Sequence, residues 1–163
     1  MFSPLKQFVP QSVCLSCDGC CRFKEEDSSW RPKISDEERL TQKIFKENVD
    51  TLSRLKTKKC STGHACQFFN LLDNTCTIYS SRPFECQFYP FLIEKKDDSP
   101  NVSAHLNCPY VQEKLHSDEF REYVAYLKEY FQKDENKSFI RNNPALIEDY
   151  SAHSAELLQL FPL

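Results

Sequence analysis

Glycine is scarce in this chain of 163 residues, which has only 2 glycines, 1 tryptophan and 1 methionine. The chain therefore has no glycine-rich loop to cradle a nucleotide, which argues against a Rossmann-type enzyme. Apolar residues never continue for the about 20 positions that a membrane-spanning helix needs. There is no sustained basic run, and the formal net charge is -3. Neither nucleic acid nor a membrane is therefore expected as a partner.

The first ten residues lack the apolar core of a secretion signal, because Pro4, Lys6, Gln7 and Pro10 interrupt it. We therefore expect a cytoplasmic protein, in a compartment where thiols are kept reduced. The chain has 9 cysteines, and in that setting they are better explained as metal ligands than as disulfides. The odd number agrees, since full pairing would leave one thiol over. Disulfide pairing is the main alternative.

Cysteine is abundant where other residue types are rare. Cys14, Cys17, Cys20 and Cys21 fall within eight consecutive positions, and the other five are Cys60, Cys66, Cys76, Cys86 and Cys108. Cysteines separated by two residues can turn their sulfur atoms toward one cation, as in zinc sites and iron–sulfur clusters. The sequence thus predicts a metal ion or cluster as the principal partner.

A zinc ion or a [4Fe–4S] cluster takes four ligands, so the chain has thiols for one centre or for two. The interval of three that separates Cys14, Cys17 and Cys20 is typical of ferredoxin-type clusters, and Cys108, which precedes Pro109, offers a remote fourth ligand. A second centre would use Cys66, Cys76 and Cys86, together with Cys21 or Cys60. His64 and His105 are alternative ligands, although a structural role is the simpler explanation for each.

Four thiolates around either centre leave about two negative charges, by counting ligands. Arg22 and Arg82 are the cations best placed in the sequence to offset that charge. Arg82 lies between two proposed ligands, Cys76 and Cys86. We therefore expect both arginines to contact the ligands rather than the metal, and to stabilise the centre in that way.

The length and the 13 phenylalanines predict a single domain over 1–163 with a substantial core. The expected fold class is α+β, a small cysteine-rich core with short hairpins that is packed by several amphipathic helices. The metal-binding core is expected at about 14–110, and a helical part at 115–163.

Two helices are predicted from capping residues and apolar spacing. The first begins at Ser35, where Ser35 and Glu38 form a capping box, and it continues to the lysines at 56–59. Its apolar stripe would contain Leu40, Ile44, Phe45, Val49, Leu52 and Leu55. The second helix begins after Ser117, with its apolar face formed by Phe120, Tyr123, Val124, Leu127, Tyr130 and Phe131.

The remaining elements are shorter. We predict a hairpin over 66–79 that turns at Asp73 and Asn74, and a second hairpin that pairs 91–95 with 101–106. A short helix that carries Cys86 is expected to open at 80–83. A last helix is expected after Pro144, with Leu146, Tyr150, Leu157 and Phe161 on one side.

The cysteine pattern also resembles a known family. Cys14-x-x-Cys17-x-Gly-Cys20-Cys21, followed by Cys66, Cys76 and Ile-Tyr-x-x-Arg-Pro-x-x-Cys86, is similar to the CxxCxxCC family, the YkgJ-like zinc- or iron-chelating proteins. The resemblance covers about residues 14–110 and implies eight ligand candidates: Cys14, Cys17, Cys20, Cys21, Cys66, Cys76, Cys86 and Cys108. Cys60 is then an additional thiol. A related module in flagellin lysine methylases, where it is associated with a [4Fe–4S] cluster, implies an accessory role in protein methylation.

We therefore expect a metal-binding protein with a cysteine-ligated centre, either a [4Fe–4S] cluster or zinc, in a structural or redox role. A cluster-dependent enzyme, or an accessory to protein methylation that contacts a protein partner, is the first alternative. A metallochaperone or iron-delivery protein is the second. No catalytic residue can be named from the sequence, so enzymatic activity is left open.

Overall fold

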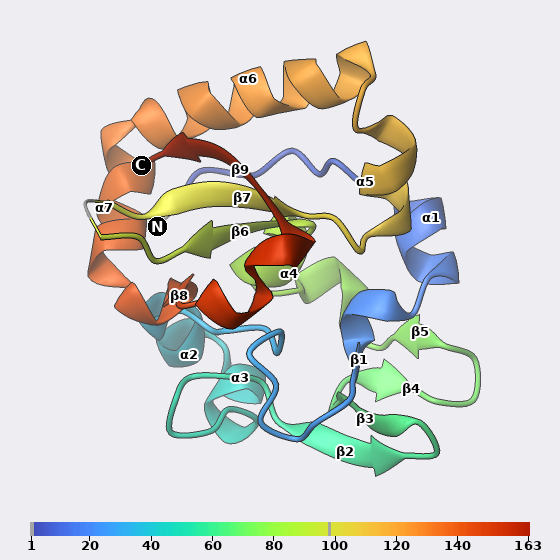
Figure 1. Cartoon of the computed structure of the whole chain (residues 1–163). Helices are drawn as coiled ribbons and strands as arrows, with labels where there is room; N and C mark the ends of the chain where they lie inside the picture. The colour runs from blue at the N-terminus through green and yellow to red at the C-terminus, as the bar shows by residue number, and fades with distance from the viewer. Residues whose placement is uncertain (1, 98) are drawn as a thin grey trace. The chain divides into compact units, whose positions relative to one another are not determined.

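The computed structural model describes residues 2–97 and 99–163, and its chain divides into two compact units (Figure 1). We call Val9–Gln87 the cysteine unit, because it contains eight of the nine cysteines. The sheet unit consists of Met1–Phe8 and Phe88–Leu163. Each unit contains both helices and strands, so the predicted α+β class is confirmed.

The cysteine unit contains short elements only. They are α1 (Gln11–Ser16), η1 (Gly19–Cys21), β1 (Arg22–Phe23), α2 (Asp36–Thr41), α3 (Lys43–Glu47), β2 (Thr57–Cys60), β3 (Gly63–Cys66), β4 (Phe69–Asn70), β5 (Thr75–Cys76), η2 (Tyr79–Ser81) and α4 (Phe84–Phe88), whose last residue belongs to the sheet unit. Three strands form an antiparallel sheet in the order β1-β3-β2, and β4 pairs with β5. Such short elements depend on tertiary packing for their stability.

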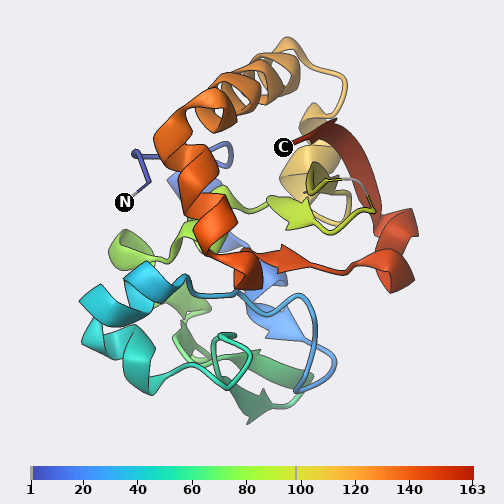
Figure 2. The same cartoon turned by 90° about the vertical axis from the view of Figure 1, so that its left-hand side faces the viewer.

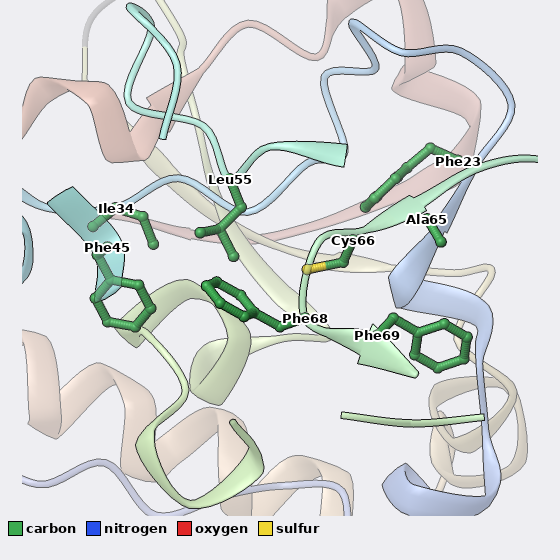
Figure 3. Packing of buried hydrophobic residues seen from close by; sticks show 8 residues of the cluster. All are labelled: Phe23, Ile34, Phe45, Leu55, Ala65, Cys66, Phe68 and Phe69. Carbon is green, nitrogen blue, oxygen red and sulfur yellow. The ribbon is translucent and has the colours of Figure 1, made fainter. Parts of the chain in front are cut away.

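A compact apolar cluster supplies that packing (Figure 3). Phe45 and Leu55 are almost fully buried, and Phe68 lies beside them. Figure 3 shows Cys66 between this group and a second one around Phe69. Burying an aromatic or leucine side chain contributes roughly 1.5–3 kcal/mol, so this cluster is the main support of the cysteine-bearing strands.

The predicted long helix after Ser35 is only partly correct. The capping box is present: Glu38 N donates to Ser35 Oγ over 3.2 Å, and Ser35 N donates to Glu38 Oε2 over 2.9 Å. However, α2 ends at Thr41, and α3 follows as a separate helix. Leu40 is 82% exposed and Leu52 is 62% exposed, so the predicted apolar stripe does not form one buried face.

Beyond α3, residues 50–54 form a turn rather than a helix because Asp50 offers the backbone other partners. Its Oδ1 accepts hydrogen bonds from Leu52 N and Arg54 N, and Ser53 has a positive φ of 59°. These bonds build a turn in place of a helical ladder. Of the lysines predicted at the helix end, Lys58 and Lys59 lie instead in β2, where Lys58 pairs with Ala65, and Lys56 precedes this strand.

The first predicted hairpin and short helix are present with shifted boundaries. β4 and β5 pair with Phe69 opposite Cys76, and Asn74 takes a positive φ of 56° in the turn. The short helix, α4, carries Cys86 as expected, but it begins at Phe84, after the proline rather than around it. η2 occupies the earlier serines.

The sheet unit is built on a four-stranded sheet in the order β8-β6-β7-β9. Its elements are β6 (Phe91–Glu94), β7 (Asn101–His105), α5 (Pro109–Lys114), α6 (Asp118–Gln132), α7 (Asp134–Asn142), η3 (Pro144–Leu146), β8 (Ile147–Glu148), η4 (Ser151–Glu156) and β9 (Leu157–Pro162). Figure 2 shows α6 and α7 meeting at a sharp change of direction. Helix α6 packs on the sheet through aromatic rings, since Phe91 stacks on Phe120 and Tyr123.

Two of the three predictions in this region are confirmed. β6 pairs antiparallel with β7, and the Ser117 hydroxyl caps α6 by accepting from Phe120 N. The predicted last helix is wrong, because residues 147–148 and 157–162 form strands. Ile147 pairs with β6, and Leu158 pairs with β7, so sheet pairing overrides the helical spacing of these apolar residues.

Candidate metal centre

Six of the predicted ligands come from separate short elements of the cysteine unit and interact with one another. One lies in α1, two in η1, one at the end of β3, one at the end of β5 and one in α4; these are Cys14, Cys20, Cys21, Cys66, Cys76 and Cys86. None of the nine cysteines, all within the part of the chain that the structure describes, is in a disulfide. The thiols are thus brought together without bonding to one another.

The first cysteine motif folds as two tight turns. Helix α1 ends at Ser16, and Cys17 N donates to the Cys14 carbonyl over 3.3 Å. Cys21 N then donates to the Asp18 carbonyl over 3.2 Å, which closes η1. This local folding places the two ends of the motif on consecutive turns and leaves Cys17 extended between them.

Cys20 is the centre of the group of thiols. Burial, followed by the charge of a Cys20 thiolate, raises the pKa of Cys14. Burial is also the main cause that raises the pKa of Cys66, to about 11, and the pKa of Cys86, and Cys20 adds to both effects. Cys76 follows the same rule, with burial first and Cys20 among the further causes.

Cys20 and Cys21 form a coupled pair. The Cys21 thiol donates a hydrogen bond to the Cys20 sulfur, and this bond is the main reason why the pKa of Cys20 is lowered. The same bond is the main cause that raises the pKa of Cys21. The hydrogen bond therefore favours the thiolate at Cys20 and the neutral thiol at Cys21.

Arg82 is a cation in contact with this group. Its Nη1 donates to Cys14 Sγ over 3.3 Å, and its guanidinium lies 3.7 Å from the centre of the Tyr79 ring. The side chain is only 9% exposed, and its Nε donates to the Tyr79 carbonyl. Its charge lowers the pKa of Cys20, after the larger effect of the Cys21 hydrogen bond. Sequence reasoning missed Tyr79, although it stands within the Ile-Tyr-x-x-Arg motif.

Arg22, the second predicted cation, has different partners. Its Nε donates to Asp18 Oδ2 over 2.6 Å, its Nη2 to Asn74 Oδ1 over 2.8 Å, and its Nη1 to Cys60 Sγ over 3.8 Å. Cys60 also contacts Thr62 Oγ1, at 3.5 Å. Arg22 and Cys60 thus form a small polar group at the end of β2.

Cys108 belongs to the sheet unit, where it is buried and precedes the first turn of α5. Its place among the ligands stays a prediction. His105 lies in the same unit, where Tyr89 Oη is 3.0 Å from its Nδ1, and burial lowers its pKa. His64 lies in β3, opposite Phe23 and Lys59.

The donor chemistry suits a metal, but the side chains are not in ligand geometry. Across residues 2–97 and 99–163, no group of three or more His, Cys, Asp or Glu side chains is arranged so that it could hold a metal ion. The interacting thiols and the adjacent guanidinium nevertheless supply the soft donors and the compensating charge that zinc or an iron–sulfur cluster requires.

A group of cysteine thiols gathered from separate short elements defines a class of metal-chelating domain. The family model of the CxxCxxCC family, described as a "putative zinc- or iron-chelating domain", matches residues 13–116, which is well over half of the chain. The chain therefore belongs to this family, as the sequence resemblance predicts. No solved structure matches the chain.

Among the described residues, none of the helices combines the length and the apolar character needed to cross a bilayer.

Proposed function

We propose that this protein holds a cysteine-ligated metal centre in its cysteine unit, either a [4Fe–4S] cluster or zinc, with a structural or redox role. One observation supports this most strongly: the charge of a Cys20 thiolate adds to the raised pKa of thiols from α1, β3, β5 and α4, which are distant in sequence. Deprotonated by a metal, they become strong ligands.

The ligand set that we propose first contains Cys14, Cys17 and Cys20, with a distant cysteine as the fourth member. Cys66, Cys76 and Cys86 are the candidates in the same unit, and Cys108 is the candidate in the sheet unit. The thiols left over, together with Cys21, would suffice for a second centre. A single centre is the simpler proposal, because Cys20 interacts with members of both groups.

Bound zinc would cross-link the elements that carry its ligands, and a bound cluster would also accept and release one electron. Arg82 would offset part of the negative charge that the thiolates bring, because it already donates to Cys14. Rotation about the Cα–Cβ bonds would be needed to turn the sulfur atoms toward a shared ion. Metal uptake should therefore release protons and become more favourable as pH rises.

Metal analysis of protein purified without oxygen tests this proposal. Iron and acid-labile sulfide in equal amounts, with a brown colour and broad visible absorption, are expected for a cluster. Colourless protein with stoichiometric zinc would establish the other choice. Folded, reduced protein that contains neither metal, and that takes up neither when reconstituted, would refute the proposal.

A metallochaperone or iron-delivery role is a second candidate, because Cys14, Cys17 and Cys76 are half-buried rather than enclosed. Competition with a chelator separates the two roles. Delivery requires a metal that exchanges within minutes, whereas the metal of a structural site exchanges more slowly. An enzymatic role, or an accessory role in protein methylation, rests on the family resemblance alone. It would be tested by binding to a candidate protein partner with and without metal.

A further inference from the structure

Helix α4 is too short to stabilise its own position. It contains five residues, Phe84–Phe88, and isolated helices of fewer than about 12 residues are marginal in water. Yet it carries Cys86, whose thiol interacts with those of Cys66 and Cys20. Something outside the helix must therefore hold it in place.

Glu38 of α2 meets the first residue of this helix. Its Oε1 accepts a hydrogen bond from Phe84 N over 2.5 Å, which satisfies an N–H group that has no partner within the helix. Its Oε2 accepts from Ser35 N over 2.9 Å and from Ser35 Oγ over 2.7 Å. One buried carboxylate, 6% exposed, thus serves the N-terminal ends of two helices.

Glu85 makes a reciprocal contact from α4. Its Oε2 accepts from Lys33 N, and its Oε1 lies 3.6 Å from Lys33 Nζ. Lys33 is 1% exposed and also donates from Nζ to the Ser29 carbonyl. A buried ammonium beside a carboxylate resists separation, because either charge left alone would be costly. We call Glu38, Glu85, Lys33 and the Phe84 N–H group the carboxylate clasp.

Two members of the carboxylate clasp, Phe84 and Glu85, lie between Arg82 and Cys86 in the sequence. It fixes the backbone of α4 from two directions, through Phe84 N and through the Glu85 side chain. A shift of this backbone would move the Cys86 thiol and the Arg82 guanidinium together. Both interact with Cys20, so the clasp sets part of the geometry of the thiol group.

From this geometry we infer that Glu38 is a positioning residue of the metal centre, an inference that rests on the proposed function. The Glu38 carboxylate accepts hydrogen bonds from Ser35 and Phe84, so it acts on the proposed ligands through α4. Partners of this outer kind typically change metal affinity by about 10–100-fold when they are removed. Removing Glu38 should therefore lower the metal affinity by more than the destabilisation of the fold alone would lower it.

The test compares Glu38→Ala with Ser35→Ala in the full chain. Both variants lose the capping box of α2, but only Glu38→Ala loses the acceptor for Phe84 N. Glu38→Gln is a milder variant, since its amide offers one acceptor oxygen to three donors. Zinc affinity is measured by chelator competition, and Glu38→Ala should lose at least about tenfold relative to Ser35→Ala.

A second readout works without metal. Alkylation of Cys86 and of Cys66 is followed by mass spectrometry in reduced, metal-free protein. Release of α4 should raise the Cys86 rate several-fold while Cys66, which lies in β3, keeps its rate. Global destabilisation would raise both rates together.

Equal increases at both cysteines, or equal zinc affinity in Glu38→Ala and Ser35→Ala, would overturn the inference. If the wild-type protein binds neither zinc nor a cluster, the proposed function fails, and the ratio of the two alkylation rates then decides only whether Glu38 holds α4 in place.

Discussion

The pKa of Cys20 is lowered, whereas the pKa values of Cys66, Cys76 and Cys86 are raised. The hydrogen bond from Cys21 favours its thiolate, whereas burial favours the neutral thiol at Cys66, Cys76 and Cys86. The thiolate rather than the thiol is the form that binds a metal. Cys20 is therefore the residue whose loss should affect metal uptake most.

We expect Cys20→Ser to abolish stoichiometric metal binding, because serine supplies neither the low-pKa thiolate nor a soft donor. The bound metal is measured by elemental analysis after reconstitution without oxygen. Cys60→Ser is the matched control and should keep the wild-type stoichiometry, since Cys60 contacts Arg22 and Thr62 rather than another thiol. Equal metal content in both variants would contradict the central role of Cys20.

Cys60 is expected to react with iodoacetamide faster than Cys66 in metal-free protein. Hydrogen bonding by Thr62 lowers its pKa, and Arg22 adds to the effect. A lowered pKa means more thiolate at a given pH, so the midpoint of the rate against pH should lie below that of an ordinary cysteine.

Thr62→Val removes the main cause of that shift and should move the midpoint of the rate profile upward, so that alkylation at pH 7 becomes slower. Cys66 is the internal comparison, because burial raises its pKa to about 11 and its thiolate is scarce at neutral pH. An unchanged midpoint in Thr62→Val would show that the hydrogen bond does not govern Cys60.

At the scale of elements, the pairing of β1 with β3 connects the first cysteine motif to Cys66. Arg22, the residue after Cys21, pairs with Ala65, the residue before Cys66. The turn that starts β3 depends on Gly63, which has a φ of 123°. A Cβ atom there would lie 2.7 Å from the Phe23 carbonyl oxygen.

Gly63→Ala should therefore destabilise the protein by about 1–3 kcal/mol, through backbone strain and this clash. The free energy of unfolding is measured by urea denaturation of the reduced protein. Gly19→Ala is the control, since a Cβ at Gly19 would meet only Cys17 Sγ, at an ordinary 3.7 Å. A larger loss in Gly19→Ala than in Gly63→Ala would contradict this account of the turn.

Local signals predict several elements correctly because their causes are local. The capping residues Ser35 and Ser117 mark helix starts, and Asn74 marks a hairpin turn. The same signals fail where distant partners decide. The hydrogen bond from Arg54 N to Asp50 forms a turn where the apolar spacing predicts a helix. Leu158 lies in a strand because it pairs with β7.

At the scale of the whole molecule, the two units obtain their stability differently. The sheet unit has a four-stranded sheet and a helix of 15 residues, α6, with several buried aromatic side chains. The cysteine unit has no helix longer than 6 residues within the described chain, and its core is one apolar cluster. Metal ligation would therefore add most stability to the cysteine unit.

Removing the metal with a chelator should loosen the cysteine unit first. Hydrogen exchange of backbone amides in β3 and α4 is expected to accelerate strongly, while amides in α6 and β7 keep most of their protection. Mass spectrometry of the same protein with and without chelator measures both regions at once. Equal loss of protection in the two units would contradict a stabilising centre in the cysteine unit.

The sequence by itself determined the kind of chemistry, because the identity and spacing of cysteines restrict which ligands a short loop can present. It also indicated the α+β class and the family. Only the tertiary structure decided which thiols interact, that Arg82 rests on Tyr79 beside Cys14, and that Glu38 reaches across to α4. These contacts join residues far apart in the chain, and their formation depends on packing of the whole unit rather than on any local pattern.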